Sequence, residues 1–263
     1  MFWGRPEISS ILIQPVDVRQ AIDAVVAGVS EGRYTEGRLD RSVRRILAAK
    51  RAAGLDRRRE VSLDSARAVV GDSTHHAAAA EIAAKSITLV KDSLGRVPFN
   101  AGNRRILSIT VARRADLAAG TAFNAELRRG GVGTVRAELI IAEDPGTNFA
   151  RLLAAADSAD VVIVGSYMAQ SWDARTASAP REFIDFIQGL VARGAKPIVV
   201  ALGNPYLLRE IPGVPAYIVA WGGFPVLQQA AARALLGAAP ITGRLPITIP
   251  PVATLGAGLT RTR

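Results

Sequence analysis

Hydrophobic residues in the first part of the chain recur at helical spacing. Between Ile22 and Val29 the apolar positions lie three or four residues apart, which gives one apolar face. This spacing predicts that residues 17–54 are mostly helical, with glycines at Gly32 and Gly54 ending the helices. A charged, turn-like stretch follows at residues 56–65, and it is the best domain boundary that the pattern offers.

Further along, an alanine-rich helix is predicted over residues 72–85, and short β-branched runs then alternate with helical stretches. The alternation is typical of an α/β fold: a doubly wound, mainly parallel sheet with flanking helices, here preceded by a helical N-terminal extension. Residues 243–250 are expected to add an edge strand, where prolines are tolerated. The predicted strands are 86–90, 106–111, 134–140, 161–164, 198–202 and 217–221, and the predicted helices are 121–129, 149–156, 181–192 and 225–236.

Composition fits a globular protein. Of the 263 residues, 49% are hydrophobic and 21% are charged, which is ordinary for a domain with a sizeable core. The apolar runs are far shorter than the roughly 20 residues needed to span a bilayer. The first residues do not follow the order of a secretion signal, so the sequence indicates neither membrane association nor a compartment. Because there is no cysteine, disulfides and thiolate chemistry are excluded.

The net charge of +10 comes mostly from arginine. Basic surfaces attract phosphate, so nucleic acid is the first partner to consider. The basic residues cluster at helix ends or are scattered, and no aromatic residues are interleaved with them as in nucleic-acid-binding motifs. We therefore expect an arginine-rich solvated surface and no nucleic-acid partner.

Residues 28–32 spell G-x-S-x-G, the pattern of the nucleophile elbow in serine hydrolases. The elbow needs a strand before the serine, whereas an amphipathic helix is predicted here, which favours a plain helix-ending turn. An ester hydrolase with Ser30 as nucleophile, and His75 or His76 as base, remains the alternative. The two histidines are adjacent on a helix and point about 100° apart, so they cannot bind one metal as an i, i+4 pair. No metal or organic cofactor is expected.

Several segments stand in a distinctive order: Gly32-Arg33-Tyr34, Glu81 to Asp92, Asp160-Val-Val-Ile-Val-Gly165, Gly203-Asn204-Pro205-Tyr206 and Gly243-Arg244-Leu245-Pro246. In this order they resemble family 3 glycoside hydrolases, and the resemblance spans most of residues 11–250. Residues 15–50 resemble the end of the catalytic barrel of that family, and the later segments resemble its second α/β domain. The resemblance therefore implies two parts: residues 1–60, a helical remnant of the barrel end plus linker, and residues 61–263, the C-terminal α/β domain.

The family's chemistry does not follow from these segments. A retaining glycosidase needs a nucleophilic carboxylate and an acid/base. In the family the nucleophile lies on the barrel, and in β-glucosidase members the acid/base Glu lies on the loop that corresponds to residues 165–180. This loop has no Glu. In β-N-acetylglucosaminidase members the acid/base is a barrel His. The resemblance thus implies the accessory domain of a β-N-acetylglucosaminidase-like hydrolase, with no glycosidase catalytic residue of its own and no cleavage of glycosides alone.

The same loop is the best candidate for binding. It follows the carboxyl end of a buried strand, the edge of doubly wound sheets where ligands usually bind. Its side chains could stack on a sugar and hydrogen-bond to it, or they could contact the barrel; both interpretations stay open. Without the barrel, the exposed interdomain surface of roughly 600–1,500 Å² favours self-association as a dimer or larger oligomer. The candidate binding residues are Tyr167, Gln170, Ser171, Trp172 and Asp173.

Overall fold

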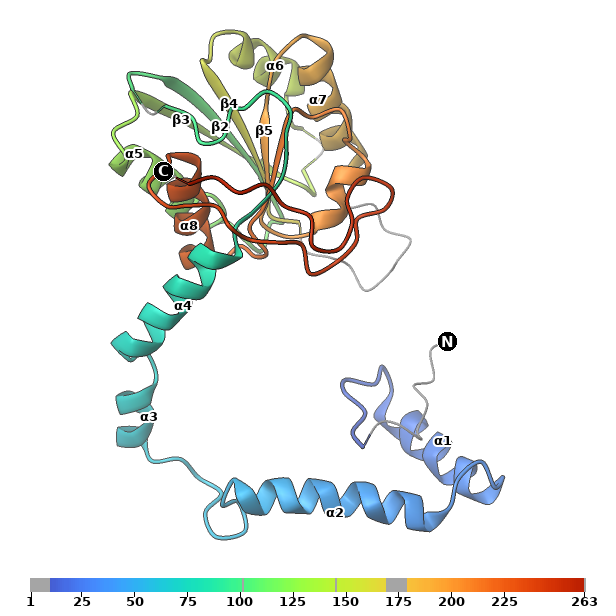
Figure 1. Cartoon of the computed structure of the whole chain (residues 1–263). Helices are drawn as coiled ribbons and strands as arrows, with labels where there is room; N and C mark the ends of the chain where they lie inside the picture. The colour runs from blue at the N-terminus through green and yellow to red at the C-terminus, as the bar shows by residue number, and fades with distance from the viewer. Residues whose placement is uncertain (1–9, 101, 145, 169–178, 263) are drawn as a thin grey trace. The chain divides into compact units, whose positions relative to one another are not determined.

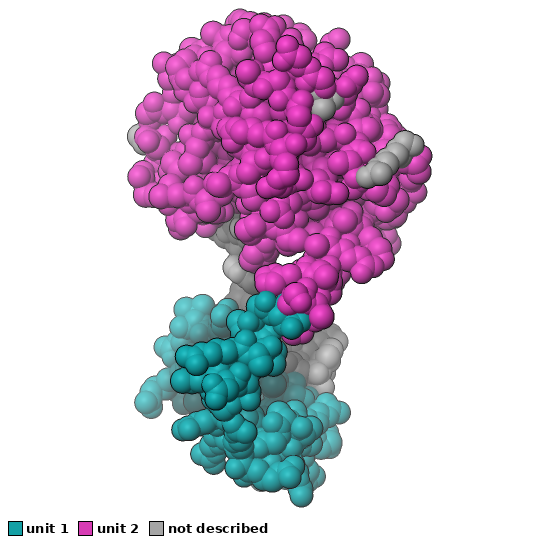
Figure 2. All heavy atoms as spheres, turned by 90° about the vertical axis from the view of Figure 1, so that its left-hand side faces the viewer, with its two compact units in different colours: residues 1–72 teal, residues 73–263 magenta. Residues whose placement is uncertain are grey.

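The computed structural model describes residues 10–100, 102–144, 146–168 and 179–262. The chain forms two compact units, residues 1–72 and 73–263, which Figure 2 shows in teal and magenta. Each unit has its own secondary structure, and the sheet lies entirely in the second one.

The first unit contains the two helices that the periodicity predicts, α1 (Val18–Ser30) and α2 (Glu36–Ala52). Asp17 is the N-cap of α1, and its Oδ1 accepts a hydrogen bond from the Gln20 amide at 2.9 Å. Gly32 has a φ of +70°, a left-handed conformation that glycine adopts without steric penalty. The expected break between the helices is confirmed.

A third helix, α3 (Leu63–Val69), lies partly in the stretch that the sequence pattern assigned to a charged turn. Its N-cap is Ser62, whose hydroxyl accepts from the Ser65 amide at 3.1 Å. The helix buries none of its residues, so it lacks the apolar stripe by which sequence patterns reveal helices.

The second unit is built on a six-stranded sheet in the order β1-β6-β5-β4-β2-β3. Figure 1 labels the neighbouring strands β5, β4, β2 and β3. All neighbouring strands are parallel except the pair β1 and β6, so the predicted doubly wound, mainly parallel sheet is confirmed. The strands are β1 (Thr88–Asp92), β2 (Arg105–Ala112), β3 (Thr134–Ile141), β4 (Val161–Ser166), β5 (Ile198–Ala201) and β6 (Ala216–Val219).

Helices cover both faces of this sheet, and each face has its own hydrophobic core (Figure 1). On one face Ile163 of β4 packs in the cluster that includes Phe123 of α5. On the other face Val164 packs in the cluster that includes Phe183 of α7. Because both faces are buried, β4 is apolar along nearly its whole length. The helices are α4 (Ser73–Ser86), α5 (Thr121–Arg129) and α8 (Pro225–Leu235) on the first face, and α6 (Phe149–Asp157) and α7 (Arg181–Ala192) on the second; a 3₁₀ helix, η1 (Pro205–Arg209), joins β5 to β6.

The C-terminal segment differs from its prediction, because residues 243–250 form no strand. The C-terminal segment instead makes isolated bridges, which pair Ile241 with Arg261, Ile249 with Ala253, and Leu259 with Leu89. Prolines at Pro246 and Pro250 cannot donate the backbone hydrogen bonds of a ladder, which explains why a continuous edge strand does not form.

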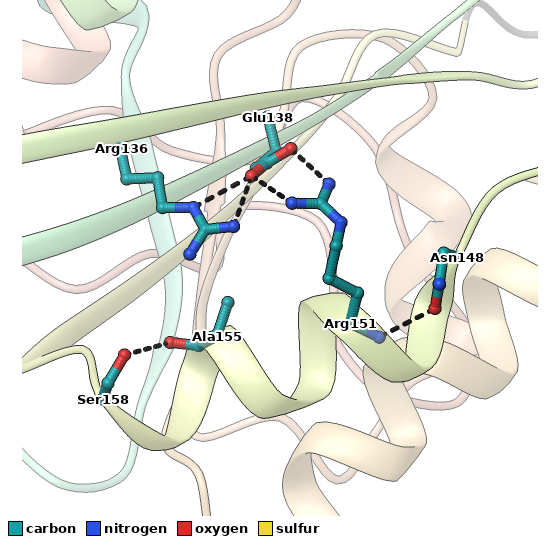
Figure 3. Close-up of polar contacts among 6 residues, drawn as sticks. All are labelled: Arg136, Glu138, Asn148, Arg151, Ala155 and Ser158. Carbon is teal, nitrogen blue, oxygen red and sulfur yellow. Dashed lines mark hydrogen bonds and ion pairs between the residues drawn. The ribbon is translucent and has the colours of Figure 1, made fainter.

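At the edge of the sheet formed by β3, an ion-pair network joins this strand to α6 (Figure 3). The Glu138 carboxylate accepts two hydrogen bonds from the Arg151 guanidinium, at 3.0 and 2.7 Å, and one from Arg136 at 2.9 Å. The Arg151 guanidinium, followed by Arg136, lowers the pKa of Glu138 although partial burial opposes the shift. Charges of this kind also discourage strand addition at an edge.

Candidate functional site

A cavity of about 800 Å³ opens in the second unit, beside the starts of α5 and α8. Its lining includes Tyr167, Leu202 and Trp221, which follow the carboxyl ends of β4, β5 and β6. In the sheet, β3 lies beside β2 at one edge, whereas β5 and β6 follow β4 in the opposite direction. The strand order therefore reverses between β2 and β4, and the cavity lies next to this switch point. In open α/β sheets this is the usual place for ligands.

Within the described part of the chain, the aromatic residues that line the cavity are Tyr167, Trp221 and Phe224. Tyr167 is almost fully buried, whereas Phe224 is 71% exposed and stands at the N-cap of α8. Trp221 has a φ of +66°, which is rare for a bulky residue, and its indole nitrogen donates to the Ser86 carbonyl at 2.9 Å. Such backbone strain often occurs at functional sites.

Tyr167 forms part of the cavity wall because two glycines let its ring approach the backbone. A Cβ atom at Gly223 would lie 3.0 Å from Tyr167 Cδ1, and one at Gly165 would lie 3.4 Å from Cε2. The buried hydroxyl has no hydrogen bond of standard geometry, although the Gly120 amide lies near it. Burial raises the pKa of this phenol; the Gly120 amide offsets part of the rise and the charge of Asp116 adds to it. The group is therefore neutral at pH 7 and unsuited to act as a base.

Further polar residues among the described lining are Gln228, Asp116 and Thr121. Buried Gln228 joins the two helix starts: its Oε1 accepts from the Phe123 amide at 3.1 Å, and its Nε2 donates to the Gly223 carbonyl at 2.7 Å. Asp116 is exposed on the segment between β2 and α5, and its Oδ2 lies 3.8 Å from the Cβ position of Gly223. Among the lining residues that the structure describes, Asp116 is the one carboxylate, whereas glycoside cleavage by the usual mechanism needs two.

Of the binding residues expected from the sequence, Tyr167 lines this cavity. Gln170, Ser171, Trp172 and Asp173 lie outside the described residues. Three contributors were not predicted from the sequence because they stand on two loops, β2–α5 and β6–α8, that only the folded sheet brings together. The sequence signal that could have identified them is their position, since each lies at the end of a predicted strand or between that strand and the helix that follows it. The contributors are Asp116, Trp221 and Phe224.

The G-x-S-x-G run has a structural explanation in the turn between α1 and α2. A Cβ atom at Gly28 would lie 2.5 Å from Tyr34 Oη, so only glycine lets this ring pack on the helix. Gly32 has the left-handed φ noted above. Ser30 is the last residue of α1, and its hydroxyl donates to the Val26 carbonyl at 3.3 Å, an ordinary contact within a helix.

His75 and His76 are both exposed on α4 in the second unit, whereas Ser30 belongs to the first. The structure thus describes no hydrogen bond that joins the serine to either histidine within the residues it covers. Over the same residues, no group of three or more His, Asp or Glu side chains is arranged to hold a metal ion. None of the described helices combines the length and apolar character needed to cross a membrane.

Comparison with known proteins places this fold. The chain matches the model of the glycosyl hydrolase family 3 C-terminal domain over residues 12–258. A β-N-acetylglucosaminidase/β-glucosidase of Cellulomonas fimi is 29% identical over 237 residues, a match that covers 84% of this chain and 40% of that protein. The chain thus spans less than half the length of this relative.

Solved structures show the same architecture. A family 3 β-N-acetylglucosaminidase from Paenibacillus sp. str. FPU-7 superposes with a TM-score of 0.63 at 24% identity, over 88% of this chain and 43% of that one. A β-glucosidase from Listeria innocua superposes with a TM-score of 0.62 at 19% identity, over 87% and 34% respectively. At these identities the likeness shows the fold alone. Together with the match over residues 12–258, it shows that the chain belongs to glycosyl hydrolase family 3, of which it contains the C-terminal domain.

Proposed function

We propose that the chain acts as the accessory domain of a β-N-acetylglucosaminidase-like glycoside hydrolase, beside a catalytic barrel, and does not cleave glycosides by itself. The main support is coverage: the matched family model is the C-terminal domain, and the match accounts for 40% of the Cellulomonas fimi relative. The lone carboxylate among the described lining residues of the cavity is also consistent with a supporting role.

Within this role, we propose that the loop from Tyr167 to Asp173 lies at the rim of the active site and contacts either the sugar or the barrel. The support is its position directly after β4, at the carboxyl edge of the sheet. Tyr167 itself is anchored by burial, so it can hold the start of the loop in place.

We also propose that the apolar faces of α1 and α2 contact the barrel or, without it, a second copy of the chain. Five large apolar side chains on these helices are more than half exposed although each helix is amphipathic. Exposed apolar surface of this kind favours association. Light scattering should therefore show a dimer or larger species for the isolated chain, and a monomer at high concentration would contradict this. The residues are Val18 (63%), Ile22 (58%), Val26 (58%), Val43 (51%) and Leu47 (57%).

A complementation assay tests the accessory role. The barrel region of the Cellulomonas fimi relative would be made separately and assayed on p-nitrophenyl N-acetylglucosaminide with and without this chain. We expect the chain to bind the barrel and raise either its activity or its thermal stability. Absence of binding at concentrations up to the solubility limit would contradict the proposal.

The ester hydrolase alternative is tested with the chain alone and a p-nitrophenyl ester. Because Ser30 is exposed at the end of a helix, we expect no saturable turnover of the ester. Ester cleavage that the Ser30→Ala substitution abolishes would support the alternative. Cleavage that survives this substitution would point to a different serine.

A further inference from the structure

The cavity beside the starts of α5 and α8 has a composition that selects its ligand. Its lining is mostly apolar, and three aromatic residues contribute to it. A sugar ring would bring several hydroxyl groups against these walls, and a hydroxyl left there without a hydrogen-bond partner weakens binding. The described lining therefore disfavours a sugar ring.

The aromatic side chains of the wall favour a flat ligand. Gly222 and Gly223 also contribute to the lining, between Trp221 and Phe224. The space beside each glycine is already filled by side chains: a Cβ atom at Gly222 would lie 3.1 Å from Leu227 Cδ1, and one at Gly223 would lie 3.0 Å from Tyr167 Cδ1. Aromatic rings pack well against such surfaces in offset or edge-to-face arrangements.

Among the described lining residues, Asp116 is the charged group that can orient the ligand. The Asp116 carboxylate is exposed, lines the cavity, and lies close to the Gly223 backbone on the side of Tyr167. As a carboxylate it only accepts hydrogen bonds, so it recognises a ligand O–H or N–H donor. Hydrogen bonds to an ionised group are stronger than those between neutral groups.

We propose that this cavity binds a planar aromatic ring that has a single O–H or N–H donor, with the ring against Phe224, Trp221 and Tyr167 and the donor on Asp116. The site lies wholly within residues 73–263, and it stands whether or not the chain acts beside a barrel.

Titration of the intact chain with four small probes, followed by the NMR signals of the Trp221 indole and the Gly222 and Gly223 amides, tests this inference. Phenol has both features, anisole lacks the donor, cyclohexanol lacks the planar ring, and N-acetylglucosamine is a sugar. We expect phenol to move these signals and to bind roughly tenfold more tightly than cyclohexanol or N-acetylglucosamine.

Variants at exposed positions separate binding from folding. Phe224→Ala should weaken phenol binding roughly three- to tenfold. Asp116→Ala should weaken phenol binding roughly tenfold but leave anisole binding unchanged. Leu117→Ala is the matched control, because Leu117 is 66% exposed next to Asp116 yet does not line the cavity, and it should leave phenol binding unchanged.

Two results would overturn the inference: tighter binding of N-acetylglucosamine than of phenol, or phenol shifts that persist undiminished in both Phe224→Ala and Asp116→Ala. Since binding is measured on the chain alone, neither result depends on the complementation assay. Failure of the proposed function is therefore distinguishable from failure of this site.

Discussion

At the scale of single residues, the turn between α1 and α2 depends on the absence of one side chain. The Tyr34 ring packs against Gly28, and its hydroxyl donates to the Val25 carbonyl at 2.8 Å. This contact fixes the tyrosine on the helix and explains why glycine occupies a position inside α1, where it ordinarily weakens a helix. The motif that suggests a serine nucleophile thus has a packing explanation.

We expect Gly28→Ala to destabilise this turn by about 1–3 kcal/mol, because the added methyl group would overlap the Tyr34 ring. Amide hydrogen exchange in α1 measures the effect directly. Gly37→Ala is the control: Gly37 lies in α2 and a Cβ there would have only Thr35 Oγ1 within 4 Å, at 3.8 Å. Because alanine favours a helix more than glycine does, Gly37→Ala should leave amide exchange in α1 unchanged and should slow it, or leave it unchanged, in α2. Equal destabilisation by both variants would show that Tyr34 packing does not matter.

At the scale of secondary-structure elements, hydrogen bonds and ion pairs of polar side chains fix the positions of neighbouring segments relative to one another, which non-directional hydrophobic packing does not do alone. Gln228 ties the start of α5 to the turn before α8 and so fixes one wall of the cavity. Glu138 ties the edge strand β3 to α6 through Arg151 (Figure 3). Neither connection can be read from periodicity, because the partners are distant in sequence or lie on different elements.

The Glu138 network should stabilise the fold in a pH-dependent way. Its pKa is lowered in the folded chain, so its contribution is present above about pH 4.3, the ordinary value for Glu, and is lost as the pH falls through the lowered pKa. At pH 7 we expect Glu138→Gln to reduce the stability of the second unit by about 0.5–1 kcal/mol, because the pair is partly exposed.

Urea unfolding followed by tryptophan fluorescence at pH 7 and at pH 3 measures this difference. The gap between the parent chain and Glu138→Gln should shrink at pH 3. Glu182→Gln, at an exposed carboxylate on α7, is the control and should change stability less. A gap that is the same at both pH values would show that the charge of Glu138 is not what stabilises β3 on α6.

At the scale of the whole molecule, the order of elements was predictable because their periodicity is strong. Residues 121–129 and 181–192 were predicted as helices and form α5 and α7 with those bounds. Periodicity does not encode which strands are neighbours, so the antiparallel placement of β1 beside β6 came only from the structure. The short helix α3 was missed because it has no buried face.

The site was less predictable than the fold. Tyr167 was found because it directly follows a buried strand, and position after a strand is visible in the sequence. Asp116 and Phe224 escaped notice because their importance depends on the loops that meet at one sheet edge. Glycines at positions such as Gly223 have a role only once the ring packed against them is known.

The central claim is that this chain supports glycoside cleavage without performing it, and the initial rate of the purified chain on p-nitrophenyl N-acetylglucosaminide tests it most directly. We expect a rate equal to that of buffer across the whole substrate range, and an unchanged rate in Asp116→Ala. A saturable rate that increases in proportion to the concentration of the chain would contradict the account.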